Sequence, residues 1–515
     1  MRIGELGVLG VAVVTGAFAA PAPAAADEPS ASERPAQSCS GDLTPGTSDF
    51  NGDGHADLAT GDPFASADGH PDAGAVTVLY GEADGGVGAG DRGRITQETP
   101  GVPGGAEDGD RFGFATEAVD LNSDGCTDLV VGIPGEDLSG VADTGALVVL
   151  YGSPDGLGQG HPTMWIDQDT TSIPGAHETA DQFGYELAAA PAKGPDAATI
   201  VAGTPYEDIG STRNAGSATA IWITSPDRIG AARWFDQDTP GVPGGPEADD
   251  LFGSDVELAE VSGSTGRWDL VVGLPYEDLG STQEAGAVTV VEDIAEAVYE
   301  YPSTWWDQSS PGVAGSVEAG DLFGTDPRFV VTPEGGYVAV GVPGEDLAGV
   351  QNGGMAQVFR TSGEGLEPQR TLHQGKPGTS DGIETDDYFG SVLHGVTRPV
   401  AGGDARLAVG VPTEDIAGAL DAGAVQSFSL DAVGYEDRWY QQGAGGVPDE
   451  PEDRDRFGAS VGSAGAGDDQ VLLAGAPRED GHGAVHALPF GDGGGTKWEP
   501  ATPQANRFGF TVSGH

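Results

Sequence analysis

Apolar and polar residues along this chain form short runs, separated by stretches rich in Gly, Pro and Asp. The runs at 128–134 (DLVVGIP) and 269–275 (DLVVGLP) are mostly apolar, and each is followed, after a turn, by an alternating segment at 145–151 or 286–291. Short runs rich in β-branched residues and bounded by turn residues are typical of strands. Since no stretch has the spacing of an amphipathic helix, the pattern predicts an all-β fold.

The runs recur with a regular period. Seven of them end in Gly-x-Pro, with prolines at 63, 134, 205, 275, 343, 412 and 477. Phe-Gly pairs recur in step, beginning at 112, 183, 252, 323, 389, 457 and 508. Each unit holds four short strand segments with Gly/Pro turns between them, and the fourth often carries Trp. This organisation is typical of a propeller blade, so we expect a seven-bladed β-propeller of four-stranded antiparallel blades.

The two ends of the chain predict how the ring closes. The first unit has its Gly-x-Pro but no Phe-Gly before it, and the missing piece is NRFGF at 506–510, which matches DRFGF at 110–114. The C-terminal strand would therefore complete the first blade and remove two exposed sheet edges. The propeller is expected to span residues 49–515.

Residues 1–26 are typical of a secretory signal peptide. Arg2 gives a positive start, residues 6–20 are apolar but too short to span a bilayer, and AAA at 24–26 fits a cleavage site. Residues 27–48 would form an N-terminal segment of the mature chain. With no later segment suited to a membrane span, we expect a secreted protein, in the medium or at the cell surface.

The chain is strongly acidic. It has 82 Asp and Glu residues against 22 Lys and Arg, for a formal net charge of -60. Binding to nucleic acid requires clustered basic residues, so this class of partner is excluded.

Two loops have the composition of calcium sites. The alternating oxygen ligands, a Gly for the bend and a closing acid are found at 49–57 and again at 120–128. The predicted metal ligands are Asp49, Asn51, Asp53, His55, Asp57, Asp120, Asn122, Asp124, Cys126 and Asp128. His55 and Cys126 would contribute backbone carbonyls. Ca²⁺ prefers six to eight such oxygens, and the acid at the ninth position closes the loop sooner than in an EF-hand. The alternative is a plain Asp/Asn/Gly turn.

These motifs resemble FG-GAP repeats. The resemblance rests on the Phe-Gly and Gly-x-Pro elements together with Asp-x-Asn-x-Asp-Gly-x-x-Asp-Leu, and it covers about residues 40–515. It implies the seven-bladed propeller found in the N-terminal region of integrin α-subunits, calcium at the two loops, and a role in adhesion.

The two cysteines of the mature chain, Cys39 and Cys126, are expected near the same face of the ring. In an oxidising compartment they can form a disulfide, and the alternative is a free, partly buried Cys126.

Acids also recur on the opposite face. Turns between second and third strands read Glu-Asp at 136–137, 207–208, 277–278, 345–346, 414–415 and 479–480. Two interpretations stay open. Each acid caps backbone N–H groups of its own turn, or the ring of acids attracts a basic partner or divalent cations.

No motif indicates catalysis. The Gly-x-Ser-x-Gly matches at 378–382 and 458–462 coincide with linker and Phe-Gly positions of the repeat. We therefore expect a monomeric, calcium-stabilised binding or adhesion module without enzymatic activity, whose ligand is an unidentified protein or glycan. The alternatives are a secreted phospholipase- or esterase-like hydrolase with a site in the propeller channel, and a structural extracellular protein that binds nothing.

Overall fold

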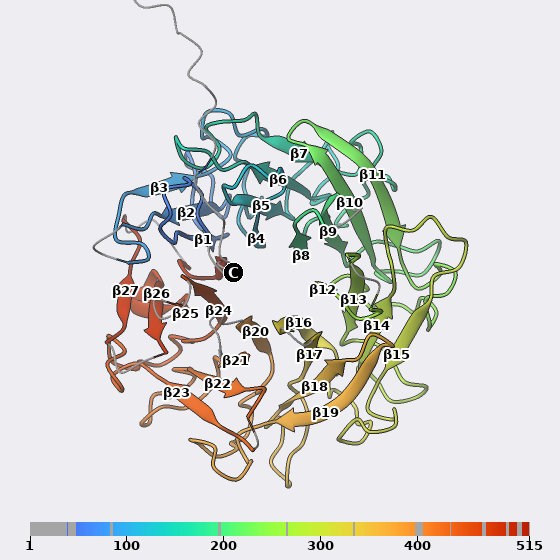
Figure 1. The fold of residues 1–515 in the computed structure, drawn as a ribbon, viewed down its shortest axis with the longest axis vertical. Coiled ribbons are helices and arrows are strands. Elements are labelled where there is room, and N and C mark those ends of the chain that lie inside the picture. Colours follow the sequence, from blue (N-terminus) through green and yellow to red (C-terminus); the bar gives the residue numbers. More distant parts are fainter. Residues whose placement is uncertain are drawn as a thin grey trace, which may run out of the picture. The chain divides into compact units, whose positions relative to one another are not determined.

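A computed structural model describes residues 39, 48–82, 86–193, 197–263, 266–332, 335–396, 405–432, 434–465, 470–490, 494–501 and 507–513. Residues 38–515 form one compact unit, in which seven four-stranded antiparallel sheets make a ring (Figure 1). The predicted all-β, seven-bladed propeller is confirmed. The predicted signal peptide at 1–26 and nearly all of the segment at 27–48 lie outside the described residues.

Each blade runs from a strand at the axis to a strand at the rim, and the blades are numbered here in chain order (Figure 1). For blades one to seven, the inner strands are β28 (Thr511–Ser513), β4 (Thr116–Val119), β8 (Leu187–Ala190), β12 (Asp255–Ala259), β16 (Thr325–Thr332), β20 (Val392–Val396) and β24 (Ser460–Ala464). The second strands are β1 (Leu58–Asp62), β5 (Asp128–Ile133), β9 (Ala198–Thr204), β13 (Asp269–Leu274), β17 (Gly335–Val342), β21 (Arg406–Val411) and β25 (Val471–Ala476).

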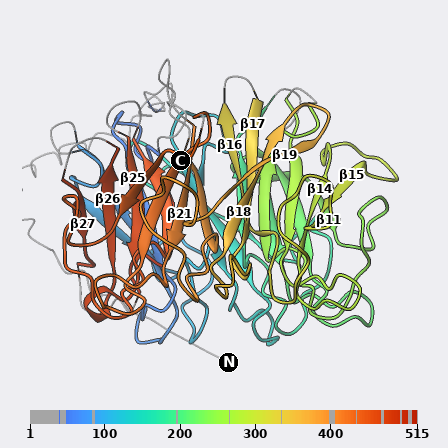
Figure 2. The ribbon, with the colours of Figure 1, turned by 90° about the horizontal axis from the view of Figure 1, so that it is seen from below.

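The third strands are β2 (Ala75–Leu79), β6 (Ala146–Leu150), β10 (Ser217–Ser225), β14 (Ala287–Val291), β18 (Met355–Thr361), β22 (Ala424–Ser429) and β26 (Ala484–Pro489). The outer strands are β3 (Arg92–Ile95), β7 (Met164–Ile166), β11 (Arg228–Phe235), β15 (Ser303–Trp306), β19 (Leu366–Leu372), β23 (Asp437–Tyr440) and β27 (Thr496–Trp498). The described part also contains a 3-10 turn, η2 (Glu479–Gly481). Viewed from the side, the strands run along the axis and the connecting loops gather on two faces (Figure 2).

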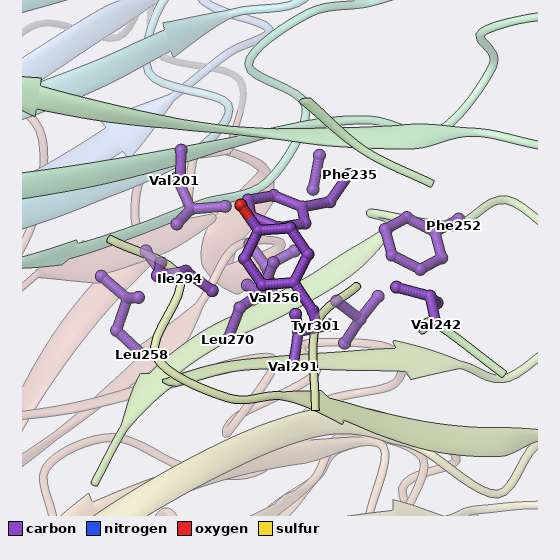
Figure 3. Close-up of a cluster of buried hydrophobic side chains, with 14 of the residues drawn as sticks. Val201, Phe235, Val242, Phe252, Val256, Leu258, Leu270, Val291, Ile294 and Tyr301 are labelled. Atoms are coloured by element: carbon purple, nitrogen blue, oxygen red, sulfur yellow. The ribbon is translucent and has the colours of Figure 1, made fainter. Parts of the chain in front are cut away.

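The middle strands are apolar because both of their faces are covered by neighbouring blades. Every residue of β5, β9 and β13 is buried, which explains why runs such as 128–134 lack alternation. Figure 3 shows one interface, in which Val201 and Phe235 of blade three pack against Val256 and Leu270 of blade four. The core of the molecule thus lies between blades.

The repeated motifs mark the places where blades meet. Phe112 is fully buried, and its backbone N–H donates to the carbonyl of Ala73 in the preceding blade at 3.0 Å. The Gly113 carbonyl lies so close to Gly61 that a side chain on Gly61 would collide with it, and Gly132 meets Gly184 in the same way. The periodic glycines are therefore a steric requirement of blade packing.

The C-terminal strand closes the ring as predicted. β28 pairs antiparallel with β1, with Thr511 opposite Gly61 and Ser513 opposite Ala59. Blade one is thus built from both ends of the chain. Among the described residues, none of the helical structure is long and apolar enough to cross a membrane.

Candidate functional site

The axis of the ring contains a cavity of about 270 Å³ bounded by the inner strands. Titratable residues line one arc of it, on or directly beside the inner strands of blades two to six: Glu117, Glu186, Glu257, Asp326, Arg328 and His394. The remaining arc, formed by β24 and β28, contributes small residues such as Ser460 and Thr511. A pocket with convergent polar groups is the usual form of a binding or active site.

Arg328 is presented by an irregular strand. The register of β16 against β17 shifts between Thr325 and Arg328, and Asp326 has a positive φ of 47°. The Arg328 Nη2 lies 2.7 Å from Asp326 Oδ1, and its Nε donates to the Leu393 carbonyl of blade six at 3.2 Å. Bulges of this kind redirect side chains and are frequent beside active sites.

Acidic side chains of the channel bridge adjacent inner strands. Asp255 Oδ1 accepts from the Asp326 N–H at 2.9 Å, and Glu257 Oε2 accepts from the Phe329 N–H at 3.2 Å. Asp326 Oδ2 in turn accepts from the Leu393 N–H at 2.5 Å. These contacts hold the carboxyl groups in place, as a preorganised site requires.

Burial gives the channel carboxyls unusual proton affinities. It raises the pKa of Glu257 to about 7 and that of Asp255 to about 6, while the Arg328 guanidinium opposes both shifts. Burial also raises the pKa of Glu186 well above its usual value, again against the attraction of Arg328. Burial therefore makes both carboxyls hold a proton more tightly than a free Glu does, and Glu257 exchanges its proton near neutral pH, as general acid–base chemistry requires.

The ten predicted calcium-loop residues lie together in two matching loops. In the first loop, Asp49 accepts from the N–H groups of Asp53 and Gly54 at 3.1 and 2.8 Å. In the second loop, Asp120 accepts from Gly125 at 3.1 Å. Asn51 and Asn122 each accept from the Asp two residues later, at 3.0 and 2.9 Å. The loops place a set of oxygen ligands that suits Ca²⁺, and the ion itself stays a prediction.

The closing acid of each loop also anchors the backbone. Asp57 accepts from the N–H groups of Phe50 and Gly81 at 2.7 and 2.8 Å, and Asp128 accepts from Leu121 and Gly152 at 2.9 and 2.8 Å. The sequence analysis assigned these acids to the metal alone. In the fold they also fasten the loop to the end of the third strand.

The two loops touch each other. The Thr127 N–H donates to the Asp49 carbonyl at 2.8 Å, and the Asp49 N–H donates to Thr127 Oγ1 at 2.9 Å. The predicted disulfide joins Cys39 to Cys126, with their Cα atoms 5.3 Å apart, and Cys39 packs directly on Gly52 of the first loop. The disulfide and the loops form one unit on this face.

On the opposite face, the Glu of each Glu-Asp turn pairs with a Gln of the preceding blade. The Gln Nε2 donates to the Glu Oε2 at 2.5–3.0 Å in six pairs: Gln97–Glu136, Gln168–Glu207, Gln237–Glu277, Gln308–Glu345, Gln374–Glu414 and Gln442–Glu479. The Asp of the turn behaves as the capping interpretation requires, since Asp137 Oδ1 accepts from the Asp143 N–H at 2.8 Å and Asp208 does the same for Asn214. Capping is thus confirmed for these Asp residues, while the Glu residues connect blades.

The sequence analysis missed the channel residues. They lie three or five positions after the Phe of a Phe-Gly pair, where the period-two pattern of a strand directs side chains to one face. Acids at these positions of an inner strand, at 117, 186, 255, 257 and 326, were the available signal.

Comparison with known proteins supports the repeat assignment. The FG-GAP repeat model matches residues 43–79 and 112–150. Phosphatidylinositol-glycan-specific phospholipase D of Bos taurus is 32% identical over 160 residues, which is 31% of this chain and 18% of the relative. The protein of the same name in Dictyostelium discoideum is 25% identical over 282 residues, covering 54% of this chain and 28% of the relative.

Two solved structures are similar in shape. A putative 6-phosphogluconolactonase of Bacteroides fragilis has a TM-score of 0.45 at 11% identity, covering 89% of this chain and 98% of that one. The periplasmic gluconolactonase PpgL of Pseudomonas aeruginosa has a TM-score of 0.43 at 12% identity, covering 88% and 97%.

The relatives correct one prediction. The sequence analysis expected a protein without enzymatic activity. That prediction is wrong, because the relatives that the chain matches are phospholipases by name. The chain spans less than a third of the length of these relatives. The match alone therefore does not assign the activity of these whole proteins to this chain.

Proposed function

Since the chain is an FG-GAP repeat protein folded as a seven-bladed propeller, we propose that it is a secreted hydrolase whose site is the central channel. The observation that carries this proposal is the group of held carboxyls with raised pKa values around Arg328 in a single cavity. The bond cleaved is a phosphodiester, the class to which the named activity of the relatives belongs, or a carboxylic ester, the second class of substrate that the sequence analysis left open.

Three side chains of the channel have different roles in the proposed reaction. Glu257, with a pKa of about 7, takes a proton from water as its oxygen attacks the phosphorus or acyl carbon. Glu186, whose pKa burial raises well above its usual value, gives a proton to the leaving oxygen. Arg328 has N–H donors beyond the two used by Asp326 and Leu393, and these stabilise the charge that develops on the substrate oxygen.

We propose in addition that the loops at 49–57 and 120–128 each bind Ca²⁺, and that these ions stabilise the fold and take no part in the reaction. Support comes from the matched geometry of the loops and the chemistry of their oxygens. Secretion, predicted from residues 1–26, fits an extracellular substrate. The unidentified protein or glycan ligand expected from the sequence becomes that substrate.

The test is turnover of chromogenic substrates by the purified protein. A phosphodiester and a carboxylic ester are compared for the wild type, Glu186→Gln and Glu257→Gln, with Glu364→Gln as the control, since Glu364 is exposed. Either channel variant should lower kcat by at least about a hundredfold, the usual contribution of a general acid or base. The wild-type rate should rise with pH through about 7 as Glu257 loses its proton.

The control variant should match the wild type in rate and melting temperature. Absence of turnover with either substrate class, or equal rates for the channel variants and the wild type, would overturn the proposal.

A further inference from the structure

A second cavity, of about 390 Å³, lies at the mouth of the channel. Four tyrosines line it: Tyr185, Tyr206, Tyr276 and Tyr388. Tyr276 is 39% exposed, which is unusual for a large aromatic side chain in a folded protein. The other three tyrosines are half-buried. Partly accessible aromatic rings gathered in a hollow indicate a surface that a ligand can cover.

The tyrosines come from repeated positions that most blades fill differently. Tyr206 and Tyr276 follow the Pro of Gly-x-Pro, where blades two and five have Gly135 and Gly344. Tyr185 is two residues after its Phe, where blades four, five and six have Ser254, Thr325 and Ser391. Phe64, Phe114 and Phe510 also fill these positions, so the aromatic rings belong to blades one to four, and blades five to seven have none there.

Tyr185 of the mouth belongs to a row of aromatic contacts that continues along the channel through Phe114 and Phe510. Tyr185 and Tyr206 meet edge to face with centroids 5.9 Å apart, and Tyr185 lies 4.9 Å from Phe114. Phe114 in turn contacts Phe510 at 5.4 Å, and Phe510 contacts Phe64 at 5.6 Å. Side chains that pack on one another in this way hold their faces in fixed directions.

The mouth leads directly into the channel. Tyr185 lines the mouth, and the next residue, Glu186, lines the channel. In the same way, Thr325 lines the mouth and Asp326 lines the channel. Asp255 lies in the wall of the mouth, two residues before Glu257 of the channel. A molecule that occupies the mouth therefore places its next few atoms beside the proposed reacting groups.

The chemistry of the mouth selects a class of ligand. Phenol rings offer flat apolar faces and hydroxyl groups together, and Ser254, Ser391 and Asp255 add donors and acceptors around them. Apolar C–H faces ringed by hydroxyls are the complement of such a surface, and pyranose sugars have both. The Asp255 carboxylate already accepts from Ser254 Oγ at 2.9 Å and from the Asp326 N–H, so its charge is partly compensated.

We propose that this mouth is a carbohydrate subsite, and that the channel acts on a glycan-bearing substrate. The first statement stands on the mouth alone. The second rests on the proposed hydrolase function. The subsite holds a sugar ring on Tyr206 and Tyr276 while the ester or phosphodiester attached to the glycan reaches Glu186 and Glu257.

The experiment measures binding of short oligosaccharides of glucose, mannose, galactose and N-acetylglucosamine by calorimetry. At least one should bind, and Tyr206→Ala and Tyr276→Ala should weaken its binding by about tenfold or more, the loss expected for one stacking contact. Tyr299→Ala is the matched control, because Tyr299 is 88% exposed and lies outside the cavity. Melting curves of all variants confirm that they fold.

The two proposals fail in different ways. Glu186→Gln should bind the oligosaccharide as the wild type does, and Tyr299→Ala should bind it and cleave the chromogenic substrate at the wild-type rate. If no oligosaccharide binds, or if choline or a lysine peptide binds through the same tyrosines without a sugar, the carbohydrate subsite is wrong, whatever the turnover assays show. If sugars bind and turnover is absent, the subsite stands and the hydrolase proposal fails.

Discussion

The two faces of the ring fasten neighbouring blades by different chemistry. On one face, two acidic loops and the Cys39–Cys126 disulfide join blades one and two in a single unit. On the other, six Gln–Glu pairs recur at successive blade interfaces. The first arrangement is local and depends on oxidation and, in our proposal, on an ion. The second is distributed and depends on protons.

Blade four provides an internal comparison for the loops. Asp269 holds the place of Asp57 and Asp128, and it accepts from the N–H groups of Val261 and Asp293 at 2.7 and 2.8 Å. The segment before it, from Glu260 onward, lacks the alternating Asp-x-Asn-x-Asp. The closing acid thus has a backbone role in a segment that lacks the other oxygens, and in our proposal the alternating oxygens are the part that binds the ion.

Of the changes that distinguish the two faces, removal of the disulfide should have the largest effect on stability. Replacing both cysteines, Cys39→Ser with Cys126→Ser, should lower the free energy of unfolding by about 4 kcal/mol, because the bridge closes a loop across 87 positions of the chain. Denaturant unfolding of the variant and the wild type measures the difference. A reducing agent should destabilise the wild type and leave the variant unaffected, and equal stabilities would contradict a disulfide that joins the two loops.

The next largest effect should come from calcium. Ca²⁺ at about ten times its Kd should stabilise the wild type by about 1.4 kcal/mol for each of the two loops over protein in EDTA, since the ion binds only the folded loops. Asp53→Ala combined with Asp124→Ala should abolish this calcium dependence, as followed by melting temperature.

Asp269→Ala is the matched control for the calcium experiment. It should destabilise the protein equally with Ca²⁺ and with EDTA, because it removes a backbone acceptor in a segment without the other ligands. A calcium response that survives in the double variant would refute both sites.

The smallest effect on stability should come from titration of a Glu residue on the opposite face. Burial and the charge of Asp250 raise the pKa of Glu277 to about 7 in the folded protein, from about 4.5 when unfolded. The folded state then binds more protons between these values, so this group stabilises the fold at low pH and the contribution is lost as the pH rises through 7. Between pH 6 and 8 the loss is about 1 kcal/mol for one such group.

Glu277→Gln should remove this share of the pH dependence, because an amide of the same shape does not titrate. Urea unfolding of both proteins at pH 6 and 8 provides the measurement. Exposed Glu364→Gln should change nothing, and an unchanged slope in Glu277→Gln would show that the Gln237–Glu277 pair is not proton-linked.

The sequence contained most of the fold and part of the site. Blade number, strand order and ring closure followed from the period of Phe-Gly and Gly-x-Pro, because a steric requirement at each blade interface must recur wherever blades meet. The calcium ions assigned to the two Asp/Asn-rich loops stay a prediction, but the geometry of these loops was predictable because all their residues are close in sequence. The Gln–Glu pairs were not, since the partners are 37–40 positions apart and each residue alone resembles a surface polar group.

The channel was the least predictable part. Arg328 stands at the same spacing from its Phe as Glu117 and Glu257, but the register shift in β16 has no signal in the sequence, and the partners of Arg328 come from several blades. The raised pKa values follow from enclosure by the whole ring. The channel residues occupy positions that differ from one repeat to the next. A search for the residues that all repeats share therefore does not find them.

Because β28 pairs with β1, the first strand of the ring to be synthesised receives its neighbour last. Gly61 and Thr511 are 450 positions apart, and nearly the whole polypeptide must emerge before the inner edge of β1 can be covered. Until then that edge offers unpaired N–H and C=O groups to any other extended chain. Production of the protein should therefore depend on how quickly the last residues follow the first, and crowding of nascent chains should favour exchange of β28 between copies.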